Sequence, residues 1–134
     1  MNKEIIPHFI AIDDDRIDNM ICLKMICKVL PGANVQTFTD PEKGLEYLLL
    51  ASSHVSQPGI ILFLDINMPT LSGWQVLEEI NTFPENARKK IKTYILSSSI
   101  NPEDKKKADN NPLVRSFIQK PLTRARLNAI LKDN

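Results

Sequence analysis

The segment Ile60-Ile61-Leu62-Phe63-Leu64-Asp65 is the most informative part of the sequence. Its first five residues are all apolar, and a carboxylate follows at once. A short run that is apolar at every position predicts a β-strand covered on both faces, as in a parallel sheet packed between helices. Asp65 would then lie where that strand ends.

Short apolar runs and longer amphipathic segments alternate on both sides of this strand. Pro41 favours a helix start at that position, with Thr39 or Asp40 as its cap. Five βα units in order predict an α/β fold, a five-stranded parallel sheet flanked by five helices in a three-layer sandwich. The predicted strands are 8–12, 35–38, 60–64, 91–96 and 113–118, and the predicted helices are 15–30, 41–51, 71–82, 102–108 and 122–131.

Composition and charge exclude several classes of protein. Lys and Arg total 17, Asp and Glu total 16, and the net charge is +1. A near-neutral chain has no general attraction for nucleic acid or for an anionic membrane surface. No apolar run approaches the ~20 residues of a membrane helix, and the first residues lack the apolar stretch of a secretory signal. We therefore expect a cytoplasmic protein of one domain that binds neither nucleic acid nor membrane.

The two cysteines, Cys22 and Cys27, lie on one predicted helix. In a reducing cytosol the simplest interpretation is a pair of buried or half-buried free thiols. A metal-binding or redox pair is the alternative.

Polar side chains follow the predicted strands. Asp13 and Asp14 follow the first strand, Asp65 the third, Ser97 the fourth and Lys120 the fifth. Because ligands of such sheets bind at the carboxyl ends of the strands, these side chains should converge on one edge. Each feature alone has a simpler explanation, since an Asp after a strand is most often a helix cap, as Asp15 would be for the helix that follows it.

Carboxylates brought together in this way repel one another in a partly desolvated site. A single ammonium, that of Lys120, balances at most one of those charges. Mg²⁺ prefers one or two carboxylates together with waters and phosphate oxygens. The pattern therefore predicts a Mg²⁺ site, with Mn²⁺ as the other candidate ion, that is completed by a phosphoryl group.

The same residues resemble the CheY-like receiver domain of two-component response regulators. The resemblance extends over residues 8–131, and we expect residues 1–134 to form one receiver domain without an output domain. The family has the flavodoxin-like architecture predicted above. The motifs are Asp13-Asp14, Leu64-Asp65-Ile66-Asn67-Met68-Pro69 followed by Gly73, Ser97 at the end of an apolar strand, and Lys120-Pro121.

The resemblance implies a role for each matched residue. Asp65 would be the phosphoacceptor, taking a phosphoryl group from a histidine kinase or a histidine phosphotransfer protein. Asp13, Asp14 and Asp65 would hold Mg²⁺ together with the backbone carbonyl of Asn67. Lys120 would pair with Asp65 at rest and with a phosphoryl oxygen afterwards.

Two further residues would form the switch. The Ser97 hydroxyl would bind a phosphoryl oxygen, and Phe117 stands where the family commonly has a switching aromatic residue. Phe117 would repack the face made by residues 102–108, 113–118 and 122–131, a surface for an unidentified downstream protein or for a weak dimer of an otherwise monomeric chain. The alternative is that Phe117 is simply a core or edge aromatic. The chain would be a signalling protein, with at most slow self-phosphorylation from small donors and slow self-dephosphorylation.

The helix predicted at 15–30 is apolar over more than one stripe. Ile17, Ile21, Met25 and Val29 are predicted to face the sheet. A second apolar flank, which includes Met20, would either be covered by neighbouring helices or dock against the helices of a kinase.

Two alternative functions use the same residues. One is a degenerate receiver that acts as an interaction module without phosphorylation. The other is a phosphatase of the haloacid dehalogenase type, which also uses an aspartyl nucleophile with Mg²⁺. Such phosphatases generally have a second Asp two residues after the nucleophile, where this chain has Asn67.

Overall fold

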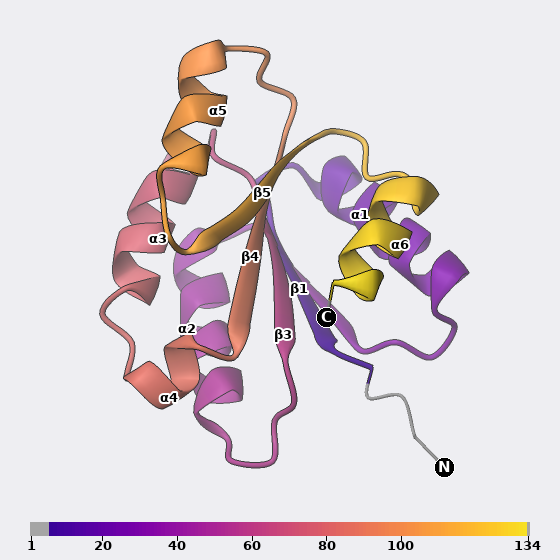
Figure 1. Ribbon diagram of the computed structural model, residues 1–134, viewed down its shortest axis with the longest axis vertical. Helices are drawn as coiled ribbons and strands as arrows, with labels where there is room; N and C mark the ends of the chain where they lie inside the picture. Colours follow the sequence, from indigo (N-terminus) through magenta and orange to yellow (C-terminus); the bar gives the residue numbers. More distant parts are fainter. Residues whose placement is uncertain (1–5, 134) are drawn as a thin grey trace.

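The computed structural model describes residues 6–133 and has the predicted α/β architecture (Figure 1). The five strands form one parallel sheet in the order β2-β1-β3-β4-β5. The elements are β1 (His8–Ile12), α1 (Arg16–Val29), β2 (Val35–Phe38), α2 (Pro41–Ser53), β3 (Ile60–Leu64), α3 (Gly73–Ile80), α4 (Glu85–Arg88), β4 (Ile91–Ser97), α5 (Pro102–Asp109), β5 (Val114–Gln119) and α6 (Arg124–Lys132).

Strand β3 is the centre of the sheet, and all five of its residues are buried. Successive side chains of a strand point to opposite faces. Ile60, Leu62 and Leu64 accordingly join one core cluster, whereas Ile61 and Phe63 join the other. The uninterrupted apolar run is therefore explained by helices on both faces, as predicted.

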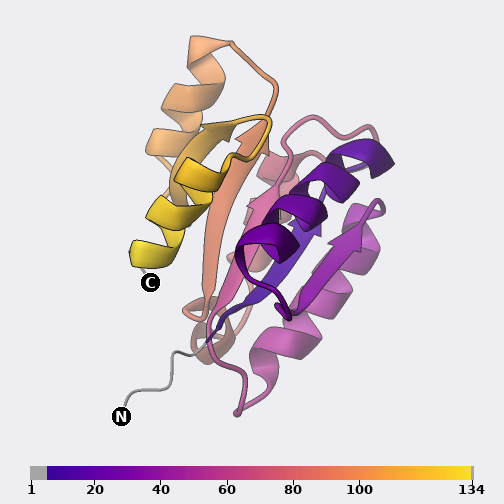
Figure 2. The ribbon, with the colours of Figure 1, turned by 90° about the vertical axis from the view of Figure 1, so that its right-hand side faces the viewer.

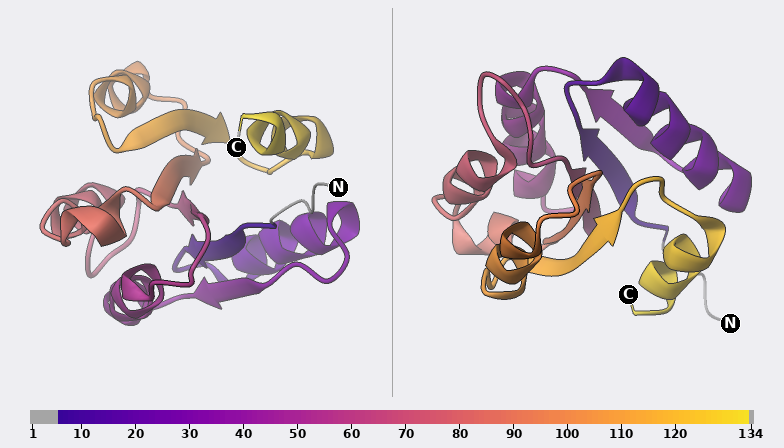
Figure 3. Two further views of the ribbon diagram at one scale, coloured as in Figure 1. Left: turned by 60° about the horizontal axis from the view of Figure 1, so that its bottom comes forward. Right: turned by 90° about the horizontal axis from the view of Figure 1, so that it is seen from above.

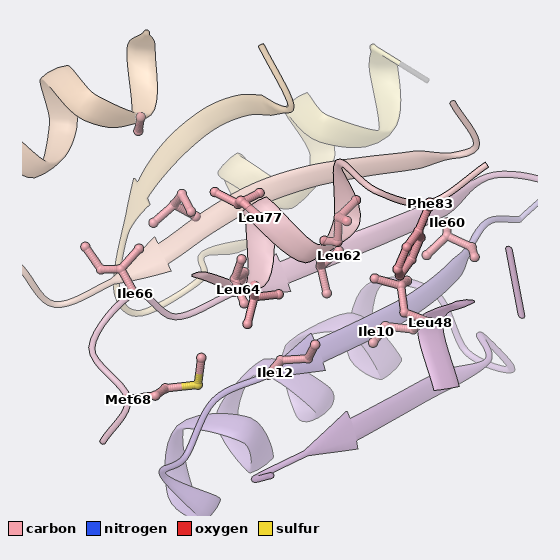
Figure 4. Close-up of a cluster of buried hydrophobic side chains, with 14 residues drawn as sticks. Ile10, Ile12, Leu48, Ile60, Leu62, Leu64, Ile66, Met68, Leu77 and Phe83 are labelled. Carbon is pink, nitrogen blue, oxygen red and sulfur yellow. The ribbon is translucent and has the colours of Figure 1, made fainter. Parts of the chain in front are cut away.

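The helices form two layers. Helices α1 and α6 cover one face of the sheet, and α2, α3 and α5 cover the other (Figures 1 and 2). The view from above in Figure 3 shows the sheet between these layers. Figure 4 shows the cluster beneath α2 and α3, where Leu48 and Leu77 pack on the strands. Within the part of the chain described, no helix is both long and apolar enough to cross a bilayer.

The described chain has six helices, so the prediction of five was wrong by one. The additional helix, α4, is a single four-residue turn that begins after Pro84. Its Ala87 is fully buried, and Arg88 donates to the carbonyl of Phe83 at 3.1 Å. A helix of one turn is too short to produce the periodic pattern by which helices are recognised in a sequence.

The predicted orientation of α1 was wrong for its first half. Ile17 and Ile21 are 66% and 44% exposed, and the buried residues are Asn19, Cys22 and Ile26. Asn19 is buried because its side-chain amide donates to the backbone carbonyls of Asp13 and Phe38, at 2.9 and 3.1 Å. These bonds tie α1 to the ends of β1 and β2 and set its rotation.

The thiols on α1 were also only partly predicted. Cys22 is buried, whereas Cys27 is exposed, and both are free. Five residues on a helix correspond to well over one turn, so the two side chains leave on different faces. Burial raises the pKa of Cys22 to about 12, which makes it an inert core thiol.

Helix α5 forms despite its nearly complete lack of apolar residues. Asn101 caps it by accepting the backbone N–H of Glu103, and Ala108 is its one buried residue. Ser99, before the helix, donates to Asp104 at 2.6 Å. Polar contacts therefore attach α5 where apolar contacts are few.

Candidate functional site

The carboxylates predicted to converge do lie together. Asp13 follows β1 and Asp65 follows β3, and the backbone N–H of Asp65 donates to the carbonyl of Ile12 at 3.0 Å. Carboxylate oxygens of Asp13, Asp14 and Asp65 all lie within 4.8 Å of one another. Asp13 and Asp65 are buried, whereas Asp14 is exposed. Solvent therefore reaches the carboxylate cluster at Asp14, whereas Asp13 and Asp65 lie beneath the surface.

Asp15 serves as a helix cap, as predicted. Its carboxylate accepts the backbone N–H groups of Ile17 and Asp18, at 2.8 and 3.3 Å. Its own backbone N–H donates to the Asp13 carboxylate at 2.9 Å. The acidic run is thus divided between a capping residue and residues that face the site.

Lys120 comes from the end of β5, where its backbone N–H donates to the Ser97 carbonyl at 2.8 Å. Its side chain is only 13% exposed. The ammonium nitrogen Nζ lies 2.7 Å from Asp13 Oδ2, 2.8 Å from Asp18 Oδ2 and 3.7 Å from Asp65 Oδ1. Its closest partners are therefore Asp13 and Asp18, with Asp65 at a longer distance.

Sequence reasoning missed Asp18 as a residue of the site. It lies in the first turn of α1, one residue before the buried Asn19. The predicted orientation of α1, with Ile17 and Ile21 against the sheet, gave no reason to place Asp18 at the site. The available signal was Asn19, because a polar side chain with carbonyls to satisfy can define the buried face of a helix.

Burial and charge shift the pKa values of the central groups. Burial raises the pKa of Asp65 to about 6, and the Asp13 carboxylate adds to the rise. Burial also raises the pKa of Asp13 above its ordinary value, against the effect of Lys120. Burial alone would lower the pKa of Lys120, but hydrogen bonds to Asp13 and Asp18 raise it well above its ordinary value.

The donor set of this site fits a hard divalent cation. The three clustered carboxylates offer only oxygen ligands, and burial, the main cause of the raised pKa values of Asp13 and Asp65, disfavours their charged forms in the free protein. Mg²⁺ and Mn²⁺ favour oxygen ligands of this kind. Asn67, the fourth predicted ligand, is exposed, and its backbone N–H donates to the Asp65 carboxylate.

The loop after β3 passes unusually close to α3. The backbone N–H of Gly73 donates to the Ile66 carbonyl at 3.1 Å. A Cβ atom at Gly73 would lie 2.5 Å from the Asp65 carbonyl oxygen and 2.7 Å from Ile66 Cα. Glycine at this position therefore allows the helix to support the backbone of Asp65 directly.

The remaining predicted residues lie on the β4 and β5 side. Ser97 is fully buried, and its hydroxyl accepts the backbone N–H of Ser99 at 3.0 Å. Phe117 is half-buried, packs against the core cluster beneath α3 and α5, and lines a groove of about 790 Å³ beside α5. Arg126 of α6 donates to the Phe117 carbonyl at 3.4 Å.

Comparison with known proteins agrees with this geometry. Residues 9–132 match the response regulator receiver domain. The chain belongs to this family. The receiver domain is a signalling module of two-component phosphorelay systems, which fits an acidic site at the carboxyl edge of a parallel sheet. No curated protein matches the chain closely enough to count as a relative.

Solved structures similar to this receiver domain include two bacterial response regulators. The two-component response regulator from Cytophaga hutchinsonii is 28% identical, with a TM-score of 0.86 and 97% of each chain covered. A receiver protein from Dyadobacter fermentans is 27% identical, with a TM-score of 0.85 and coverage of 94% of this chain and 95% of that one. The phosphorylated cyanobacterial phytochrome response regulator RcpA is 24% identical, with a TM-score of 0.70 and coverage of 96% and 91%, and it shares the fold.

Proposed function

We propose that this receiver domain takes a phosphoryl group onto Asp65 from a histidine kinase or a histidine phosphotransfer protein. The observation that carries the proposal is the set of three carboxylates whose oxygens lie within 4.8 Å, with the Lys120 ammonium beside them. The structural neighbour RcpA is described as phosphorylated, which supports the same chemistry here.

For the transfer itself, the protein needs only to position the reacting groups and to neutralise the charge on the phosphoryl oxygens. An oxygen of the Asp65 carboxylate forms a bond to phosphorus while the phosphorus–nitrogen bond of the donor histidine breaks. The electron pair of the broken bond returns to the imidazole nitrogen. Because the nucleophile is already ionised above its pKa, no general base is required.

Asp13, Asp14 and Asp65, with the backbone carbonyl of Asn67, would hold Mg²⁺ or Mn²⁺. The bound ion would supply positive charge that offsets the charge of the phosphoryl oxygens. Burial raises the pKa of Asp13 and of Asp65, and the Asp13 carboxylate adds to the rise at Asp65, so a bound cation would offset negative charge that is partly desolvated in the free protein.

Lys120 and Ser97 would stabilise the phosphoryl group from the other side. The Lys120 ammonium lies 3.7 Å from Asp65 Oδ1, so a phosphoryl oxygen bound to Asp65 would come within its reach. The Ser97 hydroxyl at the end of β4 now accepts the backbone N–H of Ser99, and its own O–H would donate to another phosphoryl oxygen. Donors already in place cost little reorganisation.

Phosphorylation would then change the surface formed by α5 and β5. Movement of Ser97 toward the phosphoryl group would pull on the β4–α5 loop, in which Ser99 also holds Asp104 of α5. Phe117, half-buried beside α5, would turn inward as that loop moves. A downstream protein would read the altered face of α5 and β5.

The phosphodonor would dock on α1. Ile17, Met20 and Ile21 are 66%, 48% and 44% exposed, and they belong to the same end of α1 as Asp18, which reaches the site. An apolar patch of this kind suits a helical partner. We expect the reaction to occur in the cytoplasm, where free thiols such as Cys22 and Cys27 stay reduced.

Binding of beryllium fluoride, a mimic of an acyl phosphate, tests this function. With Mg²⁺ present, we expect NMR amide shifts at Ser97, Lys120 and Phe117. Asp65→Asn should abolish these shifts, and Asp40→Asn should retain them, because Asp40 only caps α2. Failure of the wild-type protein to bind would instead favour an interaction module that works without phosphorylation.

A further inference from the structure

Lys120 is held from two sides. Its ammonium lies 2.7 Å from Asp13 and 2.8 Å from Asp18, whereas Asp65 is 3.7 Å away. We infer that Asp18 is a positioning residue for phosphoryl transfer, which holds the Lys120 ammonium beside Asp65. This inference rests on the function proposed above.

The backbone that carries Asp18 is held in place by contacts that do not involve Lys120. Its backbone N–H is bound by the Asp15 cap at 3.3 Å. The next residue, Asn19, fixes the first turn of α1 through hydrogen bonds to the carbonyls of Asp13 and Phe38. The side chain of Asp18 is 33% exposed, and its Oδ2 accepts directly from Lys120. A rigid turn therefore presents this carboxylate to the ammonium.

Lys120 needs such a contact because a lysine side chain is long and flexible. An unrestrained lysine loses much of its rotamer freedom when it is fixed in one geometry. Lys120 has three N–H donors, and its two short contacts occupy two of them. The third donor remains for an oxygen at Asp65. An ammonium that is already fixed in position can bind the phosphoryl group without a further loss of side-chain freedom.

Asp13 cannot be the only anchor, because it is also a candidate ligand of the cation. Its carboxylate oxygens already accept from Lys120 and from the backbone N–H of Asp15. Asp18 lies outside the group of carboxylates whose oxygens cluster within 4.8 Å. Its contact with Lys120 is therefore free of competition from the cation.

The two roles open to Asp18 make opposite predictions for its amide variant. If Asp18 positions Lys120, the amide oxygen of Asp18→Asn should still accept the hydrogen bond, and only Asp18→Ala should lose it. If Asp18 acts through its charge alone, both variants should behave alike. Asp40→Asn is the matched control, because it removes a negative charge from the same edge of the sheet while asparagine can still cap α2.

The experiment compares labelling rates with acetyl phosphate at saturating Mg²⁺, followed by intact-mass spectrometry of the full chain. We expect Asp18→Ala to be slower by about tenfold, since misplacing a catalytic group is costly. Asp18→Asn and Asp40→Asn should stay within about twofold of the wild-type rate, in line with a retained hydrogen bond. An Asp18→Ala rate equal to or above that of the wild type would overturn the inference, as would equal losses in both Asp18 variants.

A second readout does not depend on phosphorylation. Lys120 should react slowly with an acetylating reagent in the wild-type protein, because it is mostly buried and doubly bonded. Acetylation at Lys120, measured by peptide mass spectrometry relative to the exposed Lys24, should rise several-fold in Asp18→Ala. No change would overturn the positioning role. A wild-type protein that is never labelled at Asp65 would overturn the proposed function itself, and with it this inference.

Discussion

The Lys120 ammonium lies 2.8 Å from the Asp18 carboxylate, which enters the site from helix α1 and not from the end of a strand. The contact joins residues 102 positions apart in the sequence. It connects the helix that follows β1 with the loop that follows β5. The acidic site is therefore closed by a helix as well as by strand ends.

Asp65 should make the stability of the cation-free protein depend on pH. Its pKa rises from the ordinary 3.8 to about 6 in the folded state, so the folded state binds more protons than the unfolded state between these values. Stability should fall as pH rises through this window. Asp65→Asn should gain on the order of 2 kcal/mol relative to wild type between pH 4 and 7.5. Urea unfolding at both pH values tests this, and a constant difference would contradict it.

Gly73→Ala should damage the site. The added Cβ would meet the Asp65 carbonyl oxygen at 2.5 Å, and backbone atoms cannot move aside cheaply. We expect a loss of about 1–3 kcal/mol in the free energy of unfolding and slower labelling of Asp65. Gly59→Ala is the control, because a Cβ atom there would lie 4.0 Å from the Lys90 carbonyl oxygen, an ordinary van der Waals distance. Equal thermal unfolding midpoints for the two variants would count against this close approach.

Asn19→Ala should loosen α1. The substitution leaves the carbonyls of Asp13 and Phe38 without the side-chain amide that now donates to both. We expect a loss of about 2 kcal/mol of stability by urea unfolding. Asn128→Ala, on the exposed side of α6, should have almost no effect. If both variants unfolded at the same urea concentration, Asn19 would not set the rotation of α1.

Ile17→Glu should separate protein donors from small donors. A charge in the exposed patch of α1 should reduce labelling by a histidine phosphotransfer protein at least about tenfold, because an unpaired charge would be buried on docking. Labelling by acetyl phosphate should be unchanged. Val55→Glu, at a 92% exposed position between α2 and β3, should affect neither donor. Equal loss with both donors would place the effect of Ile17 in the site and not in docking.

Most of the fold follows from features that the sequence displays directly. The uninterrupted apolar run of β3 requires cover on both faces, and Pro41 after Asp40 marks the start of α2. Helix α4 was not predicted, because a helix of one turn is too short to show a repeat of apolar residues in the sequence. Its position depends on the burial of Ala87, a tertiary contact.

The site was predictable where it depends on strand ends. Asp13 and Asp65 converge because parallel strands place their carboxyl ends at one edge. Asp18 was not predicted, because its orientation depends on the rotation of α1. That rotation is set by Asn19, a polar residue buried by hydrogen bonds, which a hydropathy pattern places on the outside.

We propose Asp65 as the residue that receives the phosphoryl group. The most direct measurement is peptide mass spectrometry of the protein after incubation with acetyl phosphate and Mg²⁺, under conditions that preserve acyl phosphates. We expect a single phosphoryl adduct on the peptide that contains Asp65, absent without the cation and absent in Asp65→Asn. An adduct that maps to another residue, or no adduct in the wild-type protein, would contradict the account.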